Sequence, residues 1–126
     1  MEFQKKDAIY LQIANLMCER ILLQEWAENN RIPSVRELAV NLEVNPNTVM
    51  RAYAFLQDQG ILFNKRGIGY FVSPEGLQIT RELFRSNFVR NELPQLCRTL
   101  KLLDMDFEDF FSLYNSYQEK EDEDQQ

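Results

Sequence analysis

The sequence predicts a mainly α-helical protein with one short β-hairpin. Apolar residues recur at three- and four-residue steps along most of the chain, which is the spacing of one face of a helix. Ser34 has Glu37 three residues on, the spacing of a capping box at a helix start. Two short apolar runs flank residues 65–69, where two glycines permit the positive φ angles of a tight turn.

Length and composition narrow the range of functions. With 126 residues, of which 44% are hydrophobic and 27% charged, the chain suits one ordinary domain with a smaller appendage. It contains no histidine, which excludes Ser-His-Asp and Cys-His catalysis and histidine-containing zinc sites. Two cysteines, Cys18 and Cys97, cannot form a four-thiolate cage. We therefore expect no enzyme activity, no metal and no cofactor.

The formal net charge of −6 is unevenly distributed. Residues 1–75 are nearly balanced, with 8 basic and 9 acidic side chains, whereas residues 76–126 carry 6 and 11. Much of the excess lies in residues 119–126, which we expect to form a disordered acidic tail, with an interaction tail as the alternative. The sequence shows no secretory signal and no apolar run of membrane-spanning length, so we expect a cytoplasmic protein without membrane contact.

Three helices are expected in the first half of the chain. The first covers about residues 7–24, on the apolar stripe Ile9, Ile13, Leu16, Met17 and Ile21. The second runs from about Val35 to Leu42 behind the Ser34 cap. The third begins after Asn45, a good N-cap, with Pro46 at its first position, and ends at Gly60.

The spacing of the third helix separates a buried face from an outer face. The buried set is Val49, Ala52, Tyr53 and Leu56, and the outer set is Asn47, Met50, Arg51 and Ala54. Short strands are expected at residues 61–64 and 70–73 around the 65–69 turn. The second and third helices, joined by a short turn at residues 43–44, form a helix-turn-helix, and the hairpin that follows makes it winged.

Such a unit predicts binding to double-stranded DNA. Its third helix fits the major groove, where amide and guanidinium groups meet the base edges, and its wing lies against the neighbouring backbone or minor groove. The candidate DNA-binding residues are Arg36, Asn45, Asn47, Thr48, Met50, Arg51, Lys65, Arg66, Gly67 and Gly69. The alternative is a winged-helix protein-interaction module without base readout.

Four separated motifs resemble the GntR family of bacterial transcription regulators. They are residues 9–13 (IYLQI), 32–39 (IPSVRELA), 44–53 (VNPNTVMRAY) and 67–72 (GIGYFV). The remainder is too short for the larger effector-binding domains of other subfamilies and resembles the YtrA subfamily. The sequence does not identify a small-molecule effector. The resemblance implies a dimeric repressor on an inverted-repeat operator, often near transporter genes, with DNA contact at residues 36, 47, 48, 50, 51 and 67–69.

The chain departs from the family pattern at three positions. Met50 stands where many members have arginine, and Ile68 stands where lysine or arginine is frequent in the wing. Both changes remove a possible phosphate or guanine contact. Glu43 stands where the turn is often glycine, and it would be strained if the turn needs a positive φ.

The last fifty residues predict further helices with a wide apolar face. We expect a fourth helix opened by Ser73 and Pro74, with Pro94 kinking or interrupting it, and a last helix capped by Asp106. Because these helices cannot bury all their aromatic residues against one another, we expect a homodimer. Its candidate interface is Leu83, Phe84, Phe88, Leu96, Leu100, Phe107, Phe110, Phe111 and Tyr114. The expected domains are 1–73 (DNA-binding), 74–118 (dimerisation) and 119–126 (acidic tail).

Overall fold

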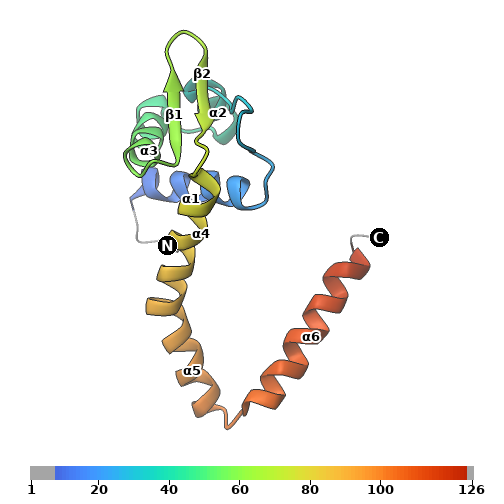
Figure 1. Cartoon of the computed structure of the whole chain (residues 1–126). Helices are drawn as coiled ribbons and strands as arrows, with labels where there is room; N and C mark the ends of the chain where they lie inside the picture. The colour runs from blue at the N-terminus through green and yellow to red at the C-terminus, as the bar shows by residue number, and fades with distance from the viewer. Residues whose placement is uncertain (1–7, 125–126) are drawn as a thin grey trace. The chain divides into compact units, whose positions relative to one another are not determined.

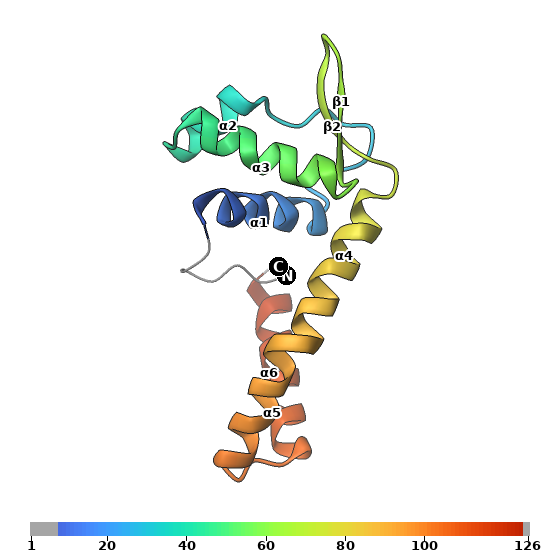
Figure 2. The same cartoon turned by 90° about the vertical axis from the view of Figure 1, so that its left-hand side faces the viewer.

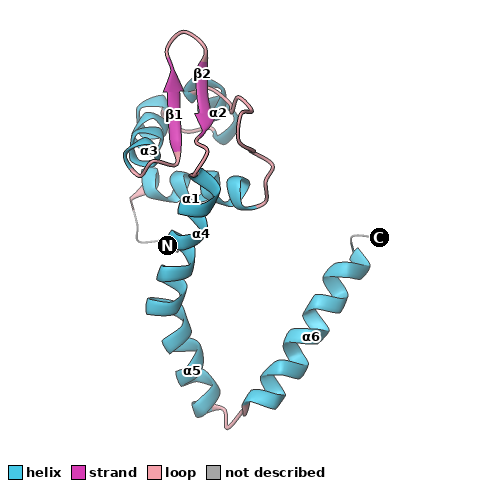
Figure 3. Ribbon diagram, in the orientation of Figure 1, coloured by secondary structure: helices cyan, strands magenta, loops and turns pink. Residues whose placement is uncertain are grey.

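A computed structural model describes residues 8–124 of the chain. It divides into two compact units between Phe88 and Val89. In the described residues the first unit contains six regular elements: α1 (Ile9–Leu22), α2 (Val35–Leu42), α3 (Pro46–Asp58), the hairpin strands β1 (Leu62–Lys65) and β2 (Gly69–Val72), and α4 (Gly76–Asn87) (Figure 1). The second contains most of a π-helical turn (Phe88–Glu92), then α5 (Leu93–Leu102) and α6 (Phe107–Asp124). The predicted class, mainly helical with one hairpin, is confirmed (Figure 3).

The core of the first unit lies where α1, α2 and the base of the hairpin pack on α3, and α4 packs on α1. All four core positions predicted for α3 are fully buried: Val49, Ala52, Tyr53 and Leu56. On α1 the buried stripe is Ile13, Ala14, Met17, Cys18 and Ile21. Ile9 and Leu16, which we expected on the apolar stripe, are exposed because they flank this narrower face. Asp7, at the expected start of the helix, lies outside the described residues.

Local capping fixes the start of α2 as predicted. The Ser34 hydroxyl accepts the N–H of Glu37 at 3.1 Å, and the Glu37 carboxylate accepts the N–H of Ser34 at 3.4 Å. This reciprocal pair satisfies two amide groups that the first helical turn would leave unpaired.

The turn between α2 and α3 passes through Glu43, which has φ 56° and ψ 46°. The left-handed conformation that was expected to strain this residue is therefore present, at a cost of roughly 1–2 kcal/mol for a side chain other than glycine. The Val44 N–H donates to Ala39 O at 3.1 Å, which closes the helix end despite that cost.

The hairpin strands have the predicted length, but they lie one residue closer to the turn than the sequence predicted. Lys65 pairs with Gly69, so both residues belong to the strands, and the turn is formed by residues 66–68. A third segment joins the hairpin: Arg31 forms an antiparallel bridge to Phe71, and the Ile32 N–H donates to Tyr70 O at 3.0 Å. Figure 2 shows the hairpin projecting beyond α2 and α3.

The expected start of α4 at Ser73 and Pro74 is wrong. The Ser73 hydroxyl donates to Gly60 O at 2.6 Å, so it ties the chain before the hairpin to the chain after it and caps no helix. The helix begins at Gly76, which is buried and has no room for a side chain, because a Cβ there would lie 2.7 Å from Ile61 O.

The boundary expected at residue 73 is displaced because α4 packs on α1. Leu83 and Phe84, which we expected in the dimer interface, are partly buried against the core of their own unit. Phe88, another expected interface residue, directly follows α4 and is exposed. The first compact unit therefore includes residues 74–88.

In the second unit, Pro94 lies in the first turn of α5, directly after the π-helical turn. Proline has no N–H to donate to the preceding turn, and the wider π-helical turn accommodates this loss. Asp106 caps α6 as predicted: its Oδ1 accepts the Asp109 N–H at 2.8 Å, and the Asp109 carboxylate accepts the Asp106 N–H at 3.2 Å.

The acidic segment differs from the expected disordered tail. Residues 119–124 continue α6 as helix, while residues 125–126 lie outside the described part. Glutamate and lysine are good helix formers, and each residue added to an existing helix gains a hydrogen bond without a new nucleation step. None of the described helices is long and apolar enough to span a membrane.

The two cysteines differ in exposure and therefore in expected reactivity. Cys18 is buried in α1, and burial raises the pKa of its thiol to about 12. Because the thiolate is the reactive form, we expect Cys18 in a Cys97→Ser variant to resist iodoacetamide while the protein is folded and to react in denaturant. Peptide mass spectrometry measures both states; rapid alkylation of the folded variant would contradict the buried position.

Candidate nucleic-acid interface

The N-terminus of α3 combines a side-chain cap with free polar groups. Asn45 Oδ1 accepts the Asn47 N–H at 2.8 Å, so Asn45 acts as the cap. The side chains of Asn47 and Met50 are exposed on the outer face, and Thr48 is half-buried. This end of α3 therefore presents an amide, a thioether and the positive end of the helix dipole, which is the chemistry of an anion- and base-contacting surface.

Arg51 lies differently from the other outer residues of α3. Its guanidinium carbon is 4.2 Å from the centre of the Tyr10 ring on α1, and Tyr10 in turn makes an edge-to-face contact with Phe55 at 6.5 Å. The cation is therefore held against α1, where a cation–π contact orients it. A direct base contact by Arg51 would need this side chain to leave Tyr10.

Arg36 occupies the second position of α2 and is exposed. In residues 8–124 its guanidinium has no hydrogen-bond or ion-pair partner. It borders a shallow surface depression lined otherwise by small apolar residues: Ala39, Val40, Val44 and Pro46. The structure thus brings an available guanidinium beside the turn and the start of α3, the two segments that a helix-turn-helix directs to DNA.

The wing carries its two basic side chains in different ways. The Lys65 ammonium lies 5.0 Å from the centre of the Phe71 ring and 6.0 Å from that of Phe63, and the two rings stack at 5.7 Å. Arg66 is exposed in the turn without such a contact. Gly67 has φ 81° with open space where a side chain would be, so the main chain of the tip is accessible.

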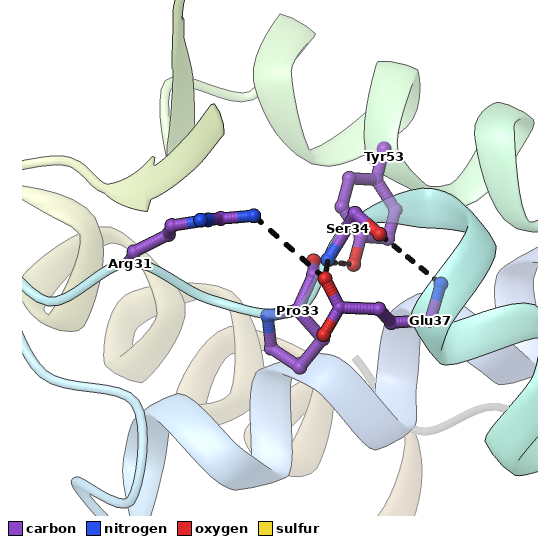
Figure 4. A network of polar contacts seen from close by, with 5 residues as sticks. All are labelled: Arg31, Pro33, Ser34, Glu37 and Tyr53. Atoms are coloured by element: carbon purple, nitrogen blue, oxygen red, sulfur yellow. Dashed lines mark hydrogen bonds and ion pairs between the residues drawn. The ribbon is translucent and has the colours of Figure 1, made fainter. Parts of the chain in front are cut away.

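Tyr53 joins α3 to the start of α2 through a polar contact, shown in Figure 4, and to the wing through an aromatic contact. The Tyr53 hydroxyl donates to Pro33 O at 2.5 Å, directly before the capping box. The Tyr53 ring makes an edge-to-face contact with Tyr70 of β2 at 4.8 Å. Burial raises the pKa of the Tyr53 hydroxyl, so it stays protonated and keeps donating.

Two residues near this surface were not predicted from the sequence: Arg31 and Tyr10. Arg31 reaches β2 through a bridge between segments forty residues apart, and Tyr10 lies under Arg51 across the α1–α3 contact. The helical spacing of α1 could have indicated that Tyr10 lies at the edge of the apolar face. The residue that Tyr10 contacts, however, depends on tertiary packing.

The candidate dimer residues beyond α4 are poorly covered within their own unit. No described residue of α5 or α6 is buried. Leu96, Leu100 and Phe110 are half-buried, while Phe107, Phe111 and Tyr114 are exposed. The two helices diverge from the turn at residues 103–106, so α6 presents an apolar face that α5 does not cover (Figure 1).

Comparison with known proteins identifies the family of this arrangement. The model of a family described as bacterial regulatory proteins, gntR family, matches residues 9–72, which is half of the chain and runs from the start of α1 to the end of β2. The chain belongs to the gntR family. The resemblance predicted from the four motifs is confirmed.

Relatives of this gntR-family chain are transcription regulators. The regulator YhcF of Bacillus subtilis is 33% identical over 118 residues, which cover 94% of this chain and 96% of YhcF. The transcriptional repressor YtrA of Bacillus subtilis is 38% identical over 88 residues, covering 70% and 67%. The similarity to YtrA agrees with the expected subfamily.

Two solved structures are also informative. A gntR-family regulator of Bacteroides thetaiotaomicron has a TM-score of 0.71 at 40% identity, with 90% of this chain and 99% of that chain covered. The DNA-binding domain of AraR, solved with an operator, has a TM-score of 0.53 at 25% identity, covering 58% and 88%. This gntR-family chain is a winged-helix, DNA-binding transcription regulator, and its family and relatives are not enzymes.

The structure places the two apolar departures from the gntR pattern on the outside. Met50 is 46% exposed on α3 and Ile68 is 58% exposed at the wing tip. Both positions therefore present an apolar side chain at the surface, where many family members were expected to present a cationic one.

Proposed function

We propose that this protein is a repressor that binds an inverted-repeat operator as a homodimer. The observation that carries the proposal is the surface of the first unit, where Arg36, the exposed Asn47 and the wing tip lie on the elements that a winged helix directs to DNA. The repressor role is supported by the name of the relative YtrA. Control of transporter genes is proposed from the resemblance to the YtrA subfamily alone.

The chemistry of this surface suits duplex DNA. The N-terminal end of α3 would enter the major groove, where Asn47 can pair with adenine and an arginine can pair with guanine. The guanidinium of Arg36 and the side chain of Arg66 suit phosphate oxygens, which fix the position of the protein on the duplex. The accessible main chain at Gly67 suits close approach to the backbone.

The dimer is supported by the apolar side chains of α5 and α6. Aromatic rings of α6 that face solvent in one chain would be covered by the same face of a second copy, as in a two-fold interface. A two-fold axis also places two recognition helices at half-sites about 34 Å, one turn of DNA, apart. An inverted repeat is the DNA sequence that matches such an axis.

Substitution of Arg36 tests the contact to DNA. We expect Arg36→Ala to weaken binding to a duplex selected from a random-sequence pool by about 5- to 150-fold, since one good base or phosphate contact contributes roughly 1–3 kcal/mol. Fluorescence anisotropy at fixed salt measures the Kd. The matched control is Arg81→Ala, at an exposed arginine on α4, which should change Kd little because salt screens distant surface charges.

The result that would contradict the proposal is equal binding by the Arg36→Ala variant and the unmodified protein. Binding that is indifferent to this change and to salt would favour the protein-interaction module, because contact with phosphates makes affinity fall with salt.

A further inference from the structure

Arg31 is a cation beside the wing that the helix-turn-helix pattern does not predict. It lies in the segment between α1 and α2, outside both helices, and forms an antiparallel bridge to Phe71. The next residue, Ile32, is buried and donates its N–H to Tyr70 O at 3.0 Å. These contacts fix the backbone of Arg31 along the edge of β2, so that its side chain starts from a rigid position.

The side chain of Arg31 runs over the glycine at the start of β2. A Cβ built on Gly69 would lie 3.0 Å from Arg31 Nε and 3.5 Å from its Cδ. Any other residue at position 69 would push the arginine aside, and its backbone would also be strained at φ 139°. Gly69 therefore has a second role besides the predicted close approach of the main chain to DNA. Because it has no side chain, it leaves room for the side chain of Arg31.

The partner of Arg31 in the free protein is weakly held. One terminal guanidinium nitrogen lies 3.7 Å from Glu37 Oε1, and both side chains are more than half exposed (Figure 4). The same Glu37 oxygen accepts the Ser34 N–H, so the carboxylate keeps a role in the helix cap when the arginine leaves. An exposed pair of this length is easily exchanged for a better partner.

The position of the guanidinium favours phosphate as that partner. It lies between Gly69 at the base of the wing turn and the N-terminal turn of α2, which carries Arg36. Both flanking segments belong to the proposed DNA surface, so this inference rests on the proposed function. A phosphate oxygen offers arginine a bidentate, charge-assisted pair that Glu37 at 3.7 Å does not.

We infer that Arg31 is a DNA-backbone contact of this protein, held by Glu37 in the free state and transferred to a phosphate on binding. The contact is independent of base sequence, since phosphates carry no direct sequence information. It adds one cation per subunit between those of α2 and the wing.

The test compares Arg31→Ala, Arg31→Lys and Glu37→Gln on the duplex selected from a random-sequence pool and on an unrelated duplex. We expect Arg31→Ala to weaken binding to both duplexes by about 5- to 10-fold and to reduce the slope of log K against log salt by about 0.9 per bound subunit. Arg31→Lys should keep most of that slope because the charge remains. Glu37→Gln preserves an acceptor for the Ser34 N–H and should strengthen binding severalfold.

A double variant separates the transfer of Arg31 from simple charge repulsion by Glu37. If the two residues are coupled, the gain from Glu37→Gln should shrink when Arg31 is alanine. An unchanged affinity and salt slope in Arg31→Ala, or a weaker affinity with an unchanged slope, would overturn the inference. Either result leaves the proposed function intact when Arg36→Ala still weakens binding, whereas absence of DNA binding by the unmodified protein would remove both.

Discussion

Glutamate in place of Phe111 is expected to convert the proposed dimer into a monomer and to lower affinity for the proposed operator by roughly 10²- to 10⁴-fold. The loss is large because two linked half-site contacts benefit from a high effective concentration that a monomer lacks. Phe111 is 51% exposed in one chain, where its ring stacks on Phe107 at 6.0 Å. The new charge therefore disturbs the proposed interface between copies more than the fold of one chain.

Sedimentation velocity at micromolar concentration and operator titration together measure this effect. The matched control is Ser112→Glu, which adds the same charge to an exposed position that lies about 100° around α6 from Phe111. This control should remain dimeric and bind normally. A dimeric Phe111→Glu protein with unchanged affinity would place the interface elsewhere.

The second large effect is expected at the centre of the first unit. Tyr53→Ala should lower the free energy of unfolding by about 3–5 kcal/mol, as for other large aromatic residues truncated in a core. The ring is fully buried, contacts Tyr70 and donates its hydroxyl to Pro33 O. Since domains of this kind have about 5–15 kcal/mol of stability, the variant should be close to unfolding.

Urea denaturation followed by circular dichroism measures this loss. Tyr53→Phe is the matched control, because it keeps the ring and removes only the hydroxyl. It should cost about 1–3 kcal/mol, the penalty for leaving Pro33 O without its donor. If the two variants unfolded at the same urea concentration, the packing of the ring would not be the main contribution.

The parts of the fold that depend on neighbouring residues were predictable from the sequence. The Ser34 and Glu37 capping box starts α2 at the expected residue, and the Asn45 cap does the same for α3. Asp106 starts α6. In each case the hydrogen bonds join residues two or three positions apart, so the pattern in the sequence contains the whole interaction.

The parts that depend on distant contacts were not predictable. Ser73 was expected to cap a helix, but the fold brings Gly60 O within 2.6 Å of its hydroxyl. Arg51 is exposed on the outer face as expected, but the packing of α1 on α3 also places Tyr10 under its guanidinium, which the spacing of α3 does not indicate. Local periodicity indicates which side of a helix is polar, but it does not indicate what the next element places there.

The candidate site shows the same division. The sequence predicted Arg36 and Asn47 at helix starts, where local caps determine position. It did not predict Arg31, whose place beside Gly69 depends on a bridge to a strand forty residues later. Exposed aromatic residues on α6 were predictable because too few apolar partners exist in residues 89–124 to cover them.

Selection of bound DNA from a random-sequence pool by the purified full chain tests the central claim most directly. The account predicts an enriched inverted repeat whose half-site centres lie about 10 bp, or a multiple of that helical repeat, apart, and whose capture weakens when Arg36 is alanine. A pool that shows no enriched sequence after repeated rounds would contradict the claim that α3 and the wing read duplex DNA.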